Sequence, residues 1–554
     1  MSISPETADR RASLTRLADD LFDVLVIGGG ITGAGVAREA ALAGYRTALV
    51  ERDDFAAGTS SRSSRLVHGG VRYLEHGHLG LVFESSHERR LLLQLAPHLV
   101  RPLAFTWPVY RGARVPRWKV RAGLLLYDAL ALFRNVQAHE GLNAAEVLER
   151  EPALTSEGLT GGARYWDAAT NDTRLTLATA LGAAASGAVL ANHCAVEGAV
   201  HSANGRLAGV TVRDVLTDTT FAVRARVVVN ATGPWSEATA ALTGESQGTQ
   251  VLGSAGTHIA VPRQRIGNHD AITMVSPLDG RVMFVLPSGP HAIVGTTEQP
   301  ARRGPDEIRA TETDVTYLLQ SVNRMFPHAA LTPDDVISAW CGIRPLAMTR
   351  AGAHSANSAS REHAVLHRAD GLVSVTGGKL TTYRAMAADV LAQARREFAT
   401  SGSAPVPIHA PLPSASTPLP GGAFASRDAL IAEARAATQD HAVAEHLVHA
   451  HGTQWQKVWR STHHTSTDAG RLVETLPYTW AEVRYTVQHE LACTLSDVLI
   501  RRTHVAFETR DHGRGAAERI APLMASLLGW SDEERVAAVA RYHADVTRLF
   551  AIDA

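Results

Sequence analysis

The chain has 554 residues, which is too long for one hydrophobic core and long enough for two or three domains. Its composition, 45% apolar and 20% charged, is ordinary for a globular protein. A formal net charge of -1 gives no reason to expect nucleic acid as a partner. Three widely spaced cysteines without a C-x-x-C motif favour neither a disulfide framework nor a zinc site, so a reducing compartment fits best.

The first 20 residues are polar and contain no apolar run, so we expect an N-terminal extension and not a secretory signal. The longest weakly polar stretch, residues 175–191, is mostly Ala, Gly, Ser and Thr. It is shorter than the ~20 strongly apolar residues that a spanning helix needs, so we expect no segment that crosses a membrane.

Residues 22–51, FDVLVIGGGITGAGVAREAALAGYRTALVE, combine a buried strand, a glycine turn, a helix, a second strand and an acid. Gly28, Gly30 and Gly33 have the G-x-G-x-x-G spacing, which allows a tight turn, close approach of a pyrophosphate, and close packing of helix on strand. The helix N-terminus suits an anion because its N–H groups are unpaired. Glu51 ends the second strand, where a carboxylate can bind both hydroxyls of a ribose. The unit therefore predicts dinucleotide binding.

Two later segments repeat the pattern of a strand that ends in glycine. Residues 225–233, ARVVVNATG, predict a buried strand ending at Ala231 and Gly233, and residues 371–394 predict a strand, two glycines and a helix. Between them, with a hairpin signal at Asp279-Gly280, lie four short strands of an expected antiparallel meander: residues 257–261, 271–276, 282–286 and 292–295. We therefore expect a sheet assembled from distant pieces, with the meander inserted.

Six prolines between residues 404 and 420 predict a linker, because proline fits neither a helix interior nor a central strand. Beyond it the sequence predicts helices, the last one capped by Ser531 and Glu534: residues 428–439, 443–450, 478–505, 516–528 and 533–550. The expected organisation is an extension over 1–20, a dinucleotide-binding domain interleaved with a substrate domain over 21–398 (substrate strands mainly 250–345), a linker over 399–425 and a helical domain over 426–554.

The late glycine-ended strand favours flavin over nicotinamide as the dinucleotide. A two-domain flavoprotein brings a late strand and helix to the isoalloxazine ring, and a helix that starts near Leu380 would point its N-terminus at the pyrimidine end of that ring. Reduced flavin is negatively charged there, and a helix dipole with nearby N–H groups stabilises that charge. An ordinary glycine-capped turn is the alternative.

Residues 58–77, GTSSRSSRLVHGGVRYLEHG, gather five Ser and Thr hydroxyls, one histidine and three arginines. Hydroxyls and backbone can solvate a pyrophosphate, while a buried arginine is costly unless it meets an anion. Each feature alone fits a serine-rich loop, a core histidine or a solvated arginine, but together they favour a binding site.

The segments VIGGGITGAGVAREAALAGYRTALVE, GTSSRSSRLVHGGVRYLE, NATGPWS, GTHIAVPR, GIRPL and TGGKLTTYR resemble, in order and spacing, the FAD-dependent glycerol-3-phosphate dehydrogenases, membrane-associated enzymes of aerobic glycerol use. The likeness runs from about residue 20 to the C-terminus, although the first 20 residues have no counterpart and the proline linker is longer than usual. It implies an α/β fold: a Rossmann-like FAD domain of the D-amino-acid-oxidase type, an inserted mixed β substrate domain and an all-helical C-terminal domain.

The resemblance also implies an activity, a location and a set of contacts. The activity is oxidation of sn-glycerol 3-phosphate to dihydroxyacetone phosphate, with FAD passing electrons to a quinone at the cytoplasmic face of the cell membrane; a homodimer stays open. The family pattern puts FAD contacts on Gly28, Gly30, Gly33, Glu51, Ser60, Ser61, Ser64, Ala231, Gly233 and Gly378. It puts substrate contacts on Arg72, Tyr73, His258, Arg344, Arg361 and Lys379.

Charge and acid-base chemistry agree with this activity. Glycerol 3-phosphate carries close to two negative charges at neutral pH, because phosphate esters ionise a second time near ~6. Arg344, placed just after an apolar strand at 336–340, can converge on one cleft with Lys379 and Arg72. Oxidation at C2 releases the hydroxyl proton, and His258 is the candidate base, with His68 in reserve and a core histidine as the alternative. We find no ligand set for a metal.

Three other functions stay open. A flavin amine or amino-acid oxidase needs a carboxylate clamp and an uncharged path for the amine, which three cations disfavour. A flavin-fold scaffold or RNA-modification component is weakened by the near-neutral charge and the lack of a long basic face. A soluble oxidase on the same template, which passes electrons to O2 and makes H2O2, remains compatible with the sequence.

Residues 111–135, RGARVPRWKVRAGLLLYDALALFRN, predict an amphipathic helix with Pro116 in its first turn. Apolar residues recur along one face: Trp118, Ala122, Leu125, Leu126, Ala129, Leu132 and Phe133. Basic residues crowd the N-terminal end without an acid: Arg111, Arg114, Arg117, Lys119 and Arg121. Such a helix can lie on an anionic membrane surface close to a quinone. The alternative is a helix whose apolar face packs on the protein.

Overall fold

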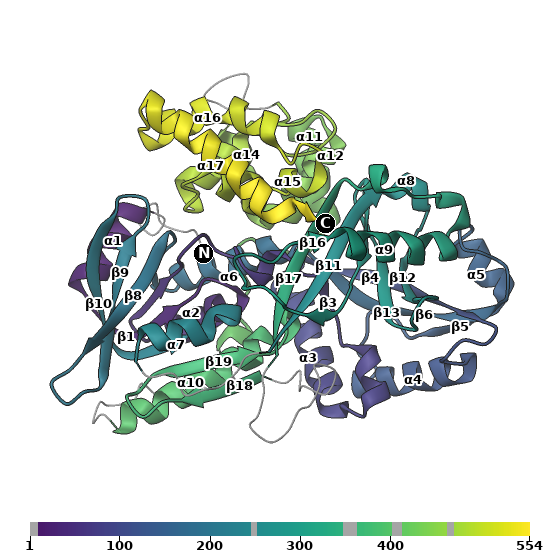
Figure 1. Cartoon of the computed structure of the whole chain (residues 1–554), viewed down its shortest axis with the longest axis horizontal. Helices are drawn as coiled ribbons and strands as arrows, with labels where there is room; N and C mark the ends of the chain where they lie inside the picture. The colour runs from purple at the N-terminus through teal and green to yellow at the C-terminus, as the bar shows by residue number, and fades with distance from the viewer. Residues whose placement is uncertain (1–8, 245–251, 347–362, 401–412, 462–469) are drawn as a thin grey trace.

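The structure is a computed structural model that describes residues 9–244, 252–346, 363–400, 413–461 and 470–554. Two large β-sheets lie next to each other, and the C-terminal helices lie across their junction (Figure 1). Strands of both sheets alternate along the chain, so neither sheet is one continuous segment.

The first sheet has the predicted parallel core built from distant pieces. Its strands run in the order β19, β10, β1, β2, β7, all parallel: Val373–Gly377, Thr219–Asn230, Leu21–Ile27, Thr47–Val50 and Val189–Ala191. Strand β18 (His363–His367) adds an antiparallel edge beside β19. These strands are covered on both faces, which explains their continuous runs of Val, Leu and Ile.

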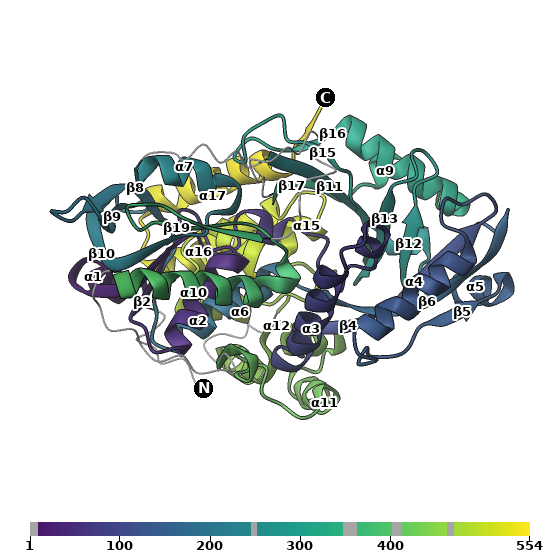
Figure 2. The ribbon, with the colours of Figure 1, turned by 90° about the horizontal axis from the view of Figure 1, so that it is seen from below.

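Helices cover one face of this sheet and an antiparallel layer covers the other. Helices α2 (Ile31–Leu42), α6 (Asp172–Ala184) and α10 (Tyr383–Thr400) lie side by side on one face (Figure 2). On the other face, β9 (Leu207–Asp214) pairs with the first half of β10, and β8 (Cys194–His201) pairs with β9. Weakly polar residues 175–191 are therefore the buried end of α6 and the strand β7, not a surface segment.

The second sheet contains the predicted meander in a different order. Strands β12 (Ala271–Val275), β13 (Val282–Ser288) and β14 (His291–Gly295) are consecutive antiparallel neighbours, with Gly280 at φ +75° in the predicted hairpin turn. Strand β11 (Leu252–Pro262) does not precede β12 in the sheet, because it pairs with β14 on one side and with β17 (Ser338–Leu346) on the other. The predicted four-strand order was wrong for this reason.

Earlier parts of the chain complete the second sheet. Strand β4 (Val100–Tyr110) pairs in parallel with β12, and β6 (Leu159–Thr170) lies between β4 and β3 (Leu66–Val67). Short strand β5 (Glu140–Leu142) joins β6, and β15 (Gln299–Pro300) joins β11. Helix α9 (Glu312–Met325) and helix α5 (Ala144–Arg150) pack on this sheet through a separate apolar cluster.

The C-terminal region is helical, as predicted, with one correction. Its helices are α11 (Arg427–Thr438), α12 (His441–His451), α13 (Trp455–Arg460), α14 (Trp480–His489), α15 (Val505–Glu508), α16 (Arg514–Leu528) and α17 (Asp532–Phe550). The predicted helix over 478–505 is not continuous: α14 ends at His489, Leu491 has φ +57°, and a π-helix follows over Asp497–Arg502. Ser531 and Glu534 form the predicted capping box of α17.

The N-terminal extension and the linker both contact the body of the protein. Helix α1 (Arg10–Asp19) buries Leu17 against the first sheet, and Arg10 pairs with Asp214 at 2.6 Å. At the other end of the linker Leu419 is buried, while residues 401–412 lie outside the described residues. The boundaries at 20, 398 and 425 stay predictions. No helix in the described ranges is long and apolar enough to cross a membrane.

Two further helices lie beside the second sheet. Helix α3 (Leu79–Leu95) and helix α4 (Arg117–Leu130) lie next to each other at the lower edge of the second sheet (Figures 1 and 2). Helix α4 is shorter than predicted, because Pro116 is its N-cap residue and Leu132 and Phe133 follow its end with φ of +54° and +53°.

Candidate active site

A cavity of about 390 Å³ lies where the carboxyl ends of β1, β10 and β19 face β11 and β17. Most of the predicted site residues line it: Gly28, Gly30, Glu51, Ser60, Ser64, His68, Arg72, Tyr73, Ala231, Gly233, His258, Arg344, Gly378 and Lys379. Gly33 and Ser61 do not line it. Arg361 lies outside the described residues. Segments far apart in sequence thus meet at the ends of parallel strands, where such folds bind ligands.

The glycine turn has the geometry that a dinucleotide needs. Gly28 has φ +107°, and a Cβ on Gly33 would overlap the Gly28 carbonyl oxygen, so α2 can pack on β1 only because residue 33 is glycine. Ser60 Oγ accepts a hydrogen bond from Ile31 N at 2.9 Å and therefore caps α2 from a distant segment. A Cβ on Gly30 would lie 3.2 Å from that hydroxyl, at the cavity wall.

Ser61 is placed differently from its neighbour Ser60. Its hydroxyl donates to the Gly58 carbonyl at 3.2 Å inside the 3-10 turn Thr59–Ser61, and its side chain is buried away from the cavity. Ser61 and Gly33 therefore contribute to the local backbone structure and are not among the residues that line the cavity.

The Glu51 carboxylate is fixed by two backbone donors. Gly29 N donates at 2.5 Å and Asp53 N donates at 2.9 Å. Burial, together with the charge of Asp53, raises the pKa of Glu51 to about 7. Ribose hydroxyls would donate to this carboxylate, and donors stabilise its charged form, so the residue fits the adenosine end of a flavin dinucleotide.

The opposite end of the cavity is formed by the segment after β19. Gly377 and Gly378 have φ of +76° and +80°, and a Cβ on Gly378 would overlap Met386 of α10. The helix predicted to start near Leu380 begins there with a 3-10 turn over Leu380–Thr382, which continues into α10 at Tyr383. Gly377, Gly378 and the start of this turn line the cavity, so a helix N-terminus stands beside it, and the residues present fit FAD.

Three cations of the substrate prediction line one part of the cavity. Arg344 lies inside β17, not after the strand as predicted, and its Nη2 donates to Thr296 Oγ1 at 3.1 Å. Burial and the charge of Arg72 lower the pKa of Arg344. Glu298 is 4.0 Å from Arg344, which leaves most of this charge for a ligand.

Lys379 completes this group of cations. Its Nζ donates to Ser85 Oγ at 3.3 Å and lies 3.8 Å from the centre of the Tyr73 ring. Burial and Arg72 lower the pKa of Lys379 to about 7, so its charge is easily changed near neutral pH. Arg72 also lies over Tyr73, at 5.4 Å. An anion between Arg72, Arg344 and Lys379 would relieve their mutual repulsion.

The candidate base His258 is buried and the reserve base His68 is half-buried, and desolvation lowers the pKa of both. His258 in β11 shares a hydrogen bond of 2.8 Å between its Nε2 and Ser64 Oγ, and its ring stacks on Trp340 at 5.6 Å. Burial, with the charges of Arg344 and Arg65, lowers the pKa of His258 to about 3. Burial, with nearby Lys379 and Arg72, lowers the pKa of His68 to about 4.

Some cavity residues were not predicted from the sequence. Thr296 follows β14 and holds Arg344, and a Cβ on Gly256 would come within 3.0 Å of Arg344. Ser85, on the buried face of α3, does not line the cavity itself but accepts a hydrogen bond from Lys379, which does. Thr296 directly follows Gly295, at the end of a strand, and a glycine after a strand is the pattern that also predicted Gly233 as a site residue. The sequence around Ser85 contains no such pattern. Of the arginines in residues 58–77, Arg65 does not line the cavity and stacks on Trp340 and Phe507.

Family models and relatives cover almost the whole chain. The model "FAD dependent oxidoreductase" matches residues 23–384, and "C-terminal domain of alpha-glycerophosphate oxidase" matches residues 413–535. Glycerol-3-phosphate dehydrogenase of Synechocystis is 34% identical over 538 residues, which cover 94% of this chain and 96% of that protein. Glycerol-3-phosphate dehydrogenase 2 of Mycobacterium tuberculosis is 37% identical, over 97% of this chain and 90% of that protein.

Solved structures agree. The glycerol-3-phosphate dehydrogenase of Bacillus halodurans in complex with FAD has a TM-score of 0.80 and 29% identity, and the match covers 99% of this chain and 98% of that one. The Mycoplasma pneumoniae L-alpha-glycerophosphate oxidase, at 18% identity and a TM-score of 0.54, shares the fold over 68% of this chain. With a cavity that fits FAD and relatives above 30% identity over nearly its full length, the chain belongs to the FAD-dependent glycerol-3-phosphate dehydrogenase family.

Proposed function

We propose that this chain oxidises sn-glycerol 3-phosphate to dihydroxyacetone phosphate and passes the electrons to a quinone. The observation that carries the proposal is that Arg72, Arg344 and Lys379 line the same cavity as Glu51 and the glycine turn. Three cations beside a flavin site suit a small phosphate dianion better than the amine or amino acid of a related oxidase. Relatives from two bacteria and from human that carry the name glycerol-3-phosphate dehydrogenase support the same substrate.

Arg344 and Lys379 would bind the phosphate. The planar guanidinium can make two parallel hydrogen bonds to phosphate oxygens, and Thr296 fixes its orientation from the side. The Lys379 ammonium, held between Ser85 and the Tyr73 ring, adds a point charge. Arg72 lies on the cavity wall near both and would complete the phosphate site.

His258 would accept the proton of the C2 hydroxyl. When bound, FAD supplies the acceptor for the hydride that leaves C2. His258 is neutral at pH 7 and can therefore take a proton, and the Ser64 hydroxyl, which lines the cavity, gives a route to its Nε2. The negative phosphate would offset the charge of Arg344, which is one cause of the low pKa, and so make the imidazole a stronger base.

Anaerobic flavin bleaching tests this function. The purified protein is mixed without oxygen with glycerol 3-phosphate, with glycerol, or with glycine, and the flavin absorbance is followed. Only glycerol 3-phosphate should bleach it, because glycerol lacks the dianion and glycine offers an amine. His258→Ala should slow the bleaching much more than it weakens substrate binding. Bleaching by glycine alone would instead assign the chain to the amine oxidases.

An exposed apolar surface on α3 and α4 supports the proposal of a membrane quinone as electron acceptor. The side chains that share it are Leu79, Phe83, Trp118, Leu125, Leu126, Leu132 and Phe133. Trp118 and Phe133 are each 71% exposed, while Val120, Leu124 and Tyr127 on the opposite face of α4 are buried. The predicted apolar face is thus turned to solvent in this chain, and several exposed apolar side chains on neighbouring helices suit a membrane interface. A homodimer stays a prediction.

Basic residues border this surface. Four of them are exposed: Arg111, Arg114, Lys119 and Arg121. Arg114 pairs at 3.1 Å with Glu75, an acid that lies outside residues 111–135 and could not be paired with it from the sequence. Helix α3 connects the surface to the site, because exposed Phe83 is two residues from Ser85, which contacts Lys379. Docking of this surface on the inner face of the cell membrane would bring a lipid-soluble quinone close to the flavin end of the cavity. Reduction of an added quinone with little H2O2 supports this acceptor, and the opposite result favours an oxidase.

A further inference from the structure

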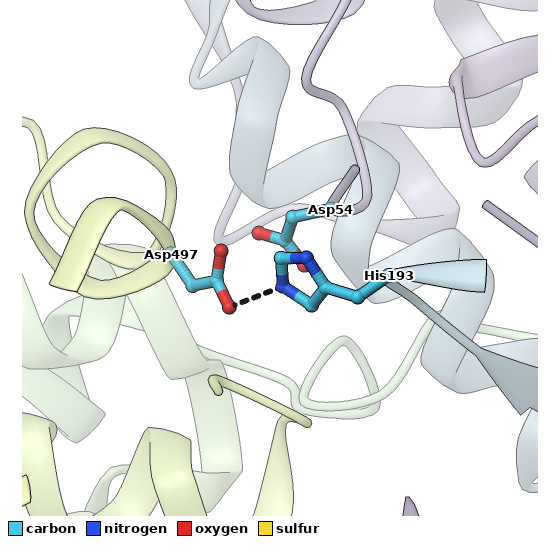
Figure 3. A group of neighbouring side chains, drawn as sticks. All are labelled: Asp54, His193 and Asp497. Carbon is cyan, nitrogen blue, oxygen red and sulfur yellow. Dashed lines mark hydrogen bonds and ion pairs between the residues drawn. The ribbon is translucent and has the colours of Figure 1, made fainter. Parts of the chain in front are cut away.

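A buried cluster of charged groups joins the helical domain to the first sheet. Arg501 Nε is 2.8 Å from Asp54 Oδ2, and Arg501 Nη2 is 2.9 Å from Asp497 Oδ1. Arg502 binds the same Asp54 carboxylate with both of its terminal nitrogens. His193 Nε2 lies 2.9 Å from Asp497 Oδ2, as drawn in Figure 3. All five side chains are buried.

The cluster has the residue types of a metal site but not its free ligand atoms. Ligand atoms of Asp54, His193 and Asp497 lie within 4.8 Å of one another. The Asp54 oxygens are already bonded to both arginines and to Asn192 Nδ2 at 2.8 Å. Asp497 Oδ2 accepts the N–H groups of Cys493 and Thr494 in addition to His193. Two guanidinium groups would also repel a cation, so these contacts describe a salt-bridge cluster.

The cluster holds the loop that follows β2, which carries Glu51. Asp54 belongs to this loop, and Asp53 N donates to Glu51 Oε1 at 2.9 Å. The Asp53 carbonyl accepts the N–H of His193 at 2.6 Å. His193, in turn, is held by Asp497 of the helical domain. A continuous set of bonds therefore runs from Asp497, Arg501 and Arg502 to the carboxylate that faces the adenosine end of the cavity.

The local structure of the helical domain suits this contact. Arg501 and Arg502 are neighbours in sequence, yet both reach one carboxylate. Successive side chains of a regular α-helix point in directions roughly 100° apart. The segment Asp497–Arg502 is a π-helix, a rare form that occurs frequently at functional sites.

We propose that the helical domain is part of the FAD site, because Arg501, Arg502 and Asp497 hold residues 51–54 in the conformation that presents Glu51 to the adenine ribose. These are positioning residues, since none of them lines the cavity. The proposal rests on FAD binding in this cavity, and the flavin content of the unchanged protein tests that point separately. A loop fixed before binding loses less conformational entropy when FAD binds, so it holds FAD more tightly.

Asp54→Asn tests the proposal in the holoenzyme. The substitution keeps the shape of the side chain but removes the charge that both arginines bind. We expect FAD to leave the variant about tenfold faster, measured as the rise of free-flavin fluorescence after dilution, with the KM for glycerol 3-phosphate of the loaded enzyme unchanged. An unchanged rate of FAD release would overturn the proposal.

Glu490→Gln is the matched control. Glu490 and Arg174 of α6 form another buried ion pair of the helical domain, with bonds of 2.6 and 2.8 Å. Glu490 also accepts hydrogen bonds from Arg502 through its backbone carbonyl, which the substitution keeps. We expect the control to lower Tm while FAD release stays at the unchanged rate. Equal acceleration in both variants would show that any weakening of the domain contact releases FAD, and would overturn the specific role of Asp54.

Hydrogen exchange gives a readout that does not depend on folding of the Asp54 variant. If the helical domain and FAD are coupled through these residues, FAD binding must stabilise the π-helix by the same coupling free energy. Removal of FAD from the unchanged protein should therefore speed amide exchange in residues 497–502, and added FAD should slow it again. Exchange in this segment that ignores FAD contradicts the proposal.

Discussion

Lys379 is a cavity residue whose pKa is lowered into the neutral range by its surroundings. Burial and the charge of Arg72 together bring its pKa to about 7, while Arg344 beside it stays charged because a guanidinium ionises far above neutral pH. The proposed phosphate site would therefore be electrostatically unfavourable without substrate and favourable with it. We expect this difference to make the site selective for a dianion.

Removal of either phosphate-binding cation should reduce kcat/KM strongly. In Arg344→Ala and Lys379→Ala a buried charge-assisted bond to the dianion is lost, and we expect losses of about 2 to 5 kcal/mol of transition-state binding. Steady-state kinetics with glycerol 3-phosphate measure this. Arg213→Gln, at an exposed ion pair on β9, is the control and should change kcat/KM little. Unchanged KM and kcat in both alanine variants would place the phosphate elsewhere.

The pH profile should report the titration of Lys379. In the free enzyme Lys379 loses its charge as pH rises through about 7, so kcat/KM should fall above that pH. Below it, kcat/KM should rise with pH while the substrate phosphate ionises near ~6. Lys379→Arg keeps the charge at all these pH values, and its profile should lose the fall on the alkaline side. A variant profile with the same fall would assign it to another group.

Gly30 lines the cavity and is the residue that we propose to lie closest to the FAD pyrophosphate. Gly30→Val would put two methyl groups beside Ser60 at the cavity wall, and we expect the purified variant to contain almost no FAD. The flavin-to-protein absorbance ratio measures this. Gly198→Ala in β8, where a Cβ would meet nothing within 4 Å, is the control and should keep its flavin. A yellow Gly30→Val protein would mean that the pyrophosphate lies farther from α2.

At the scale of elements, the glycine-ended strands were predicted correctly because each is a local pattern. The π-helix over Asp497–Arg502 was missed, because residues 478–505 have no proline and their apolar spacing continues the pattern of α14. What ends α14 is tertiary: Glu490 binds Arg174 of α6, and Asp497 binds His193. Ion pairs between distant segments leave no periodic signal in the sequence.

Helix α4 should control attachment to membranes. Replacing Trp118 and Phe133 together by Ser removes two side chains that are each 71% exposed, so folding should be little affected while interfacial binding weakens. Changing Arg114, Arg117, Lys119 and Arg121 together to Gln should also weaken binding, each cation being worth about 1 kcal/mol at an anionic surface. Sedimentation with anionic liposomes at low and high salt measures both effects.

The control for this experiment lies on α17. Val536→Ser removes an apolar side chain that is 61% exposed on the helical domain and should leave liposome binding unchanged. If neither salt nor either set of substitutions changed liposome binding, membrane attachment would no longer be part of the proposed function. The exposed apolar surface would then be assigned to another partner.

At the scale of the whole molecule, one apolar cluster is shared by the second sheet and the helical domain. Phe105, Trp107 and Trp340 of the sheet belong to it together with Leu499, Phe507 and Phe550 of the helices. Phe507 packs edge-on against both Trp340 and Phe550, at 5.3 and 4.9 Å. Trp340 also stacks on His258, so the helical domain supports the proposed base as well as the FAD loop.

Phe507→Ala should therefore destabilise both parts at once. We expect a loss of about 3 to 5 kcal/mol and a lower Tm, with the circular dichroism transition and the release of flavin still coinciding. Val536→Ala, at an exposed position, should leave Tm within a degree or so of the unchanged protein. The domains would unfold independently if two separate transitions appeared and the variant lowered the midpoint only of the transition that does not release flavin.

The sequence by itself determined the local units of this protein. The glycine turn with Glu51, the two later glycine-ended strands, the capped helix α17 and the amphipathic α4 are set by short-range physics: positive φ, helix capping and apolar period. Residues 58–77 could be recognised as a binding site because local secondary structure does not require so many hydroxyls and cations in one segment.

Only the tertiary structure decided which of these residues meet. It put β11 beside β14, placed Arg344 inside β17 with Thr296 as its partner, and turned Ser61 and Gly33 away from the cavity. It also joined Asp54, His193 and the arginines at 501 and 502, residues up to 448 positions apart. Sheet order and buried ion pairs depend on how segments that are distant in sequence pack together. Such packing leaves no periodic pattern in the sequence from which it could be predicted.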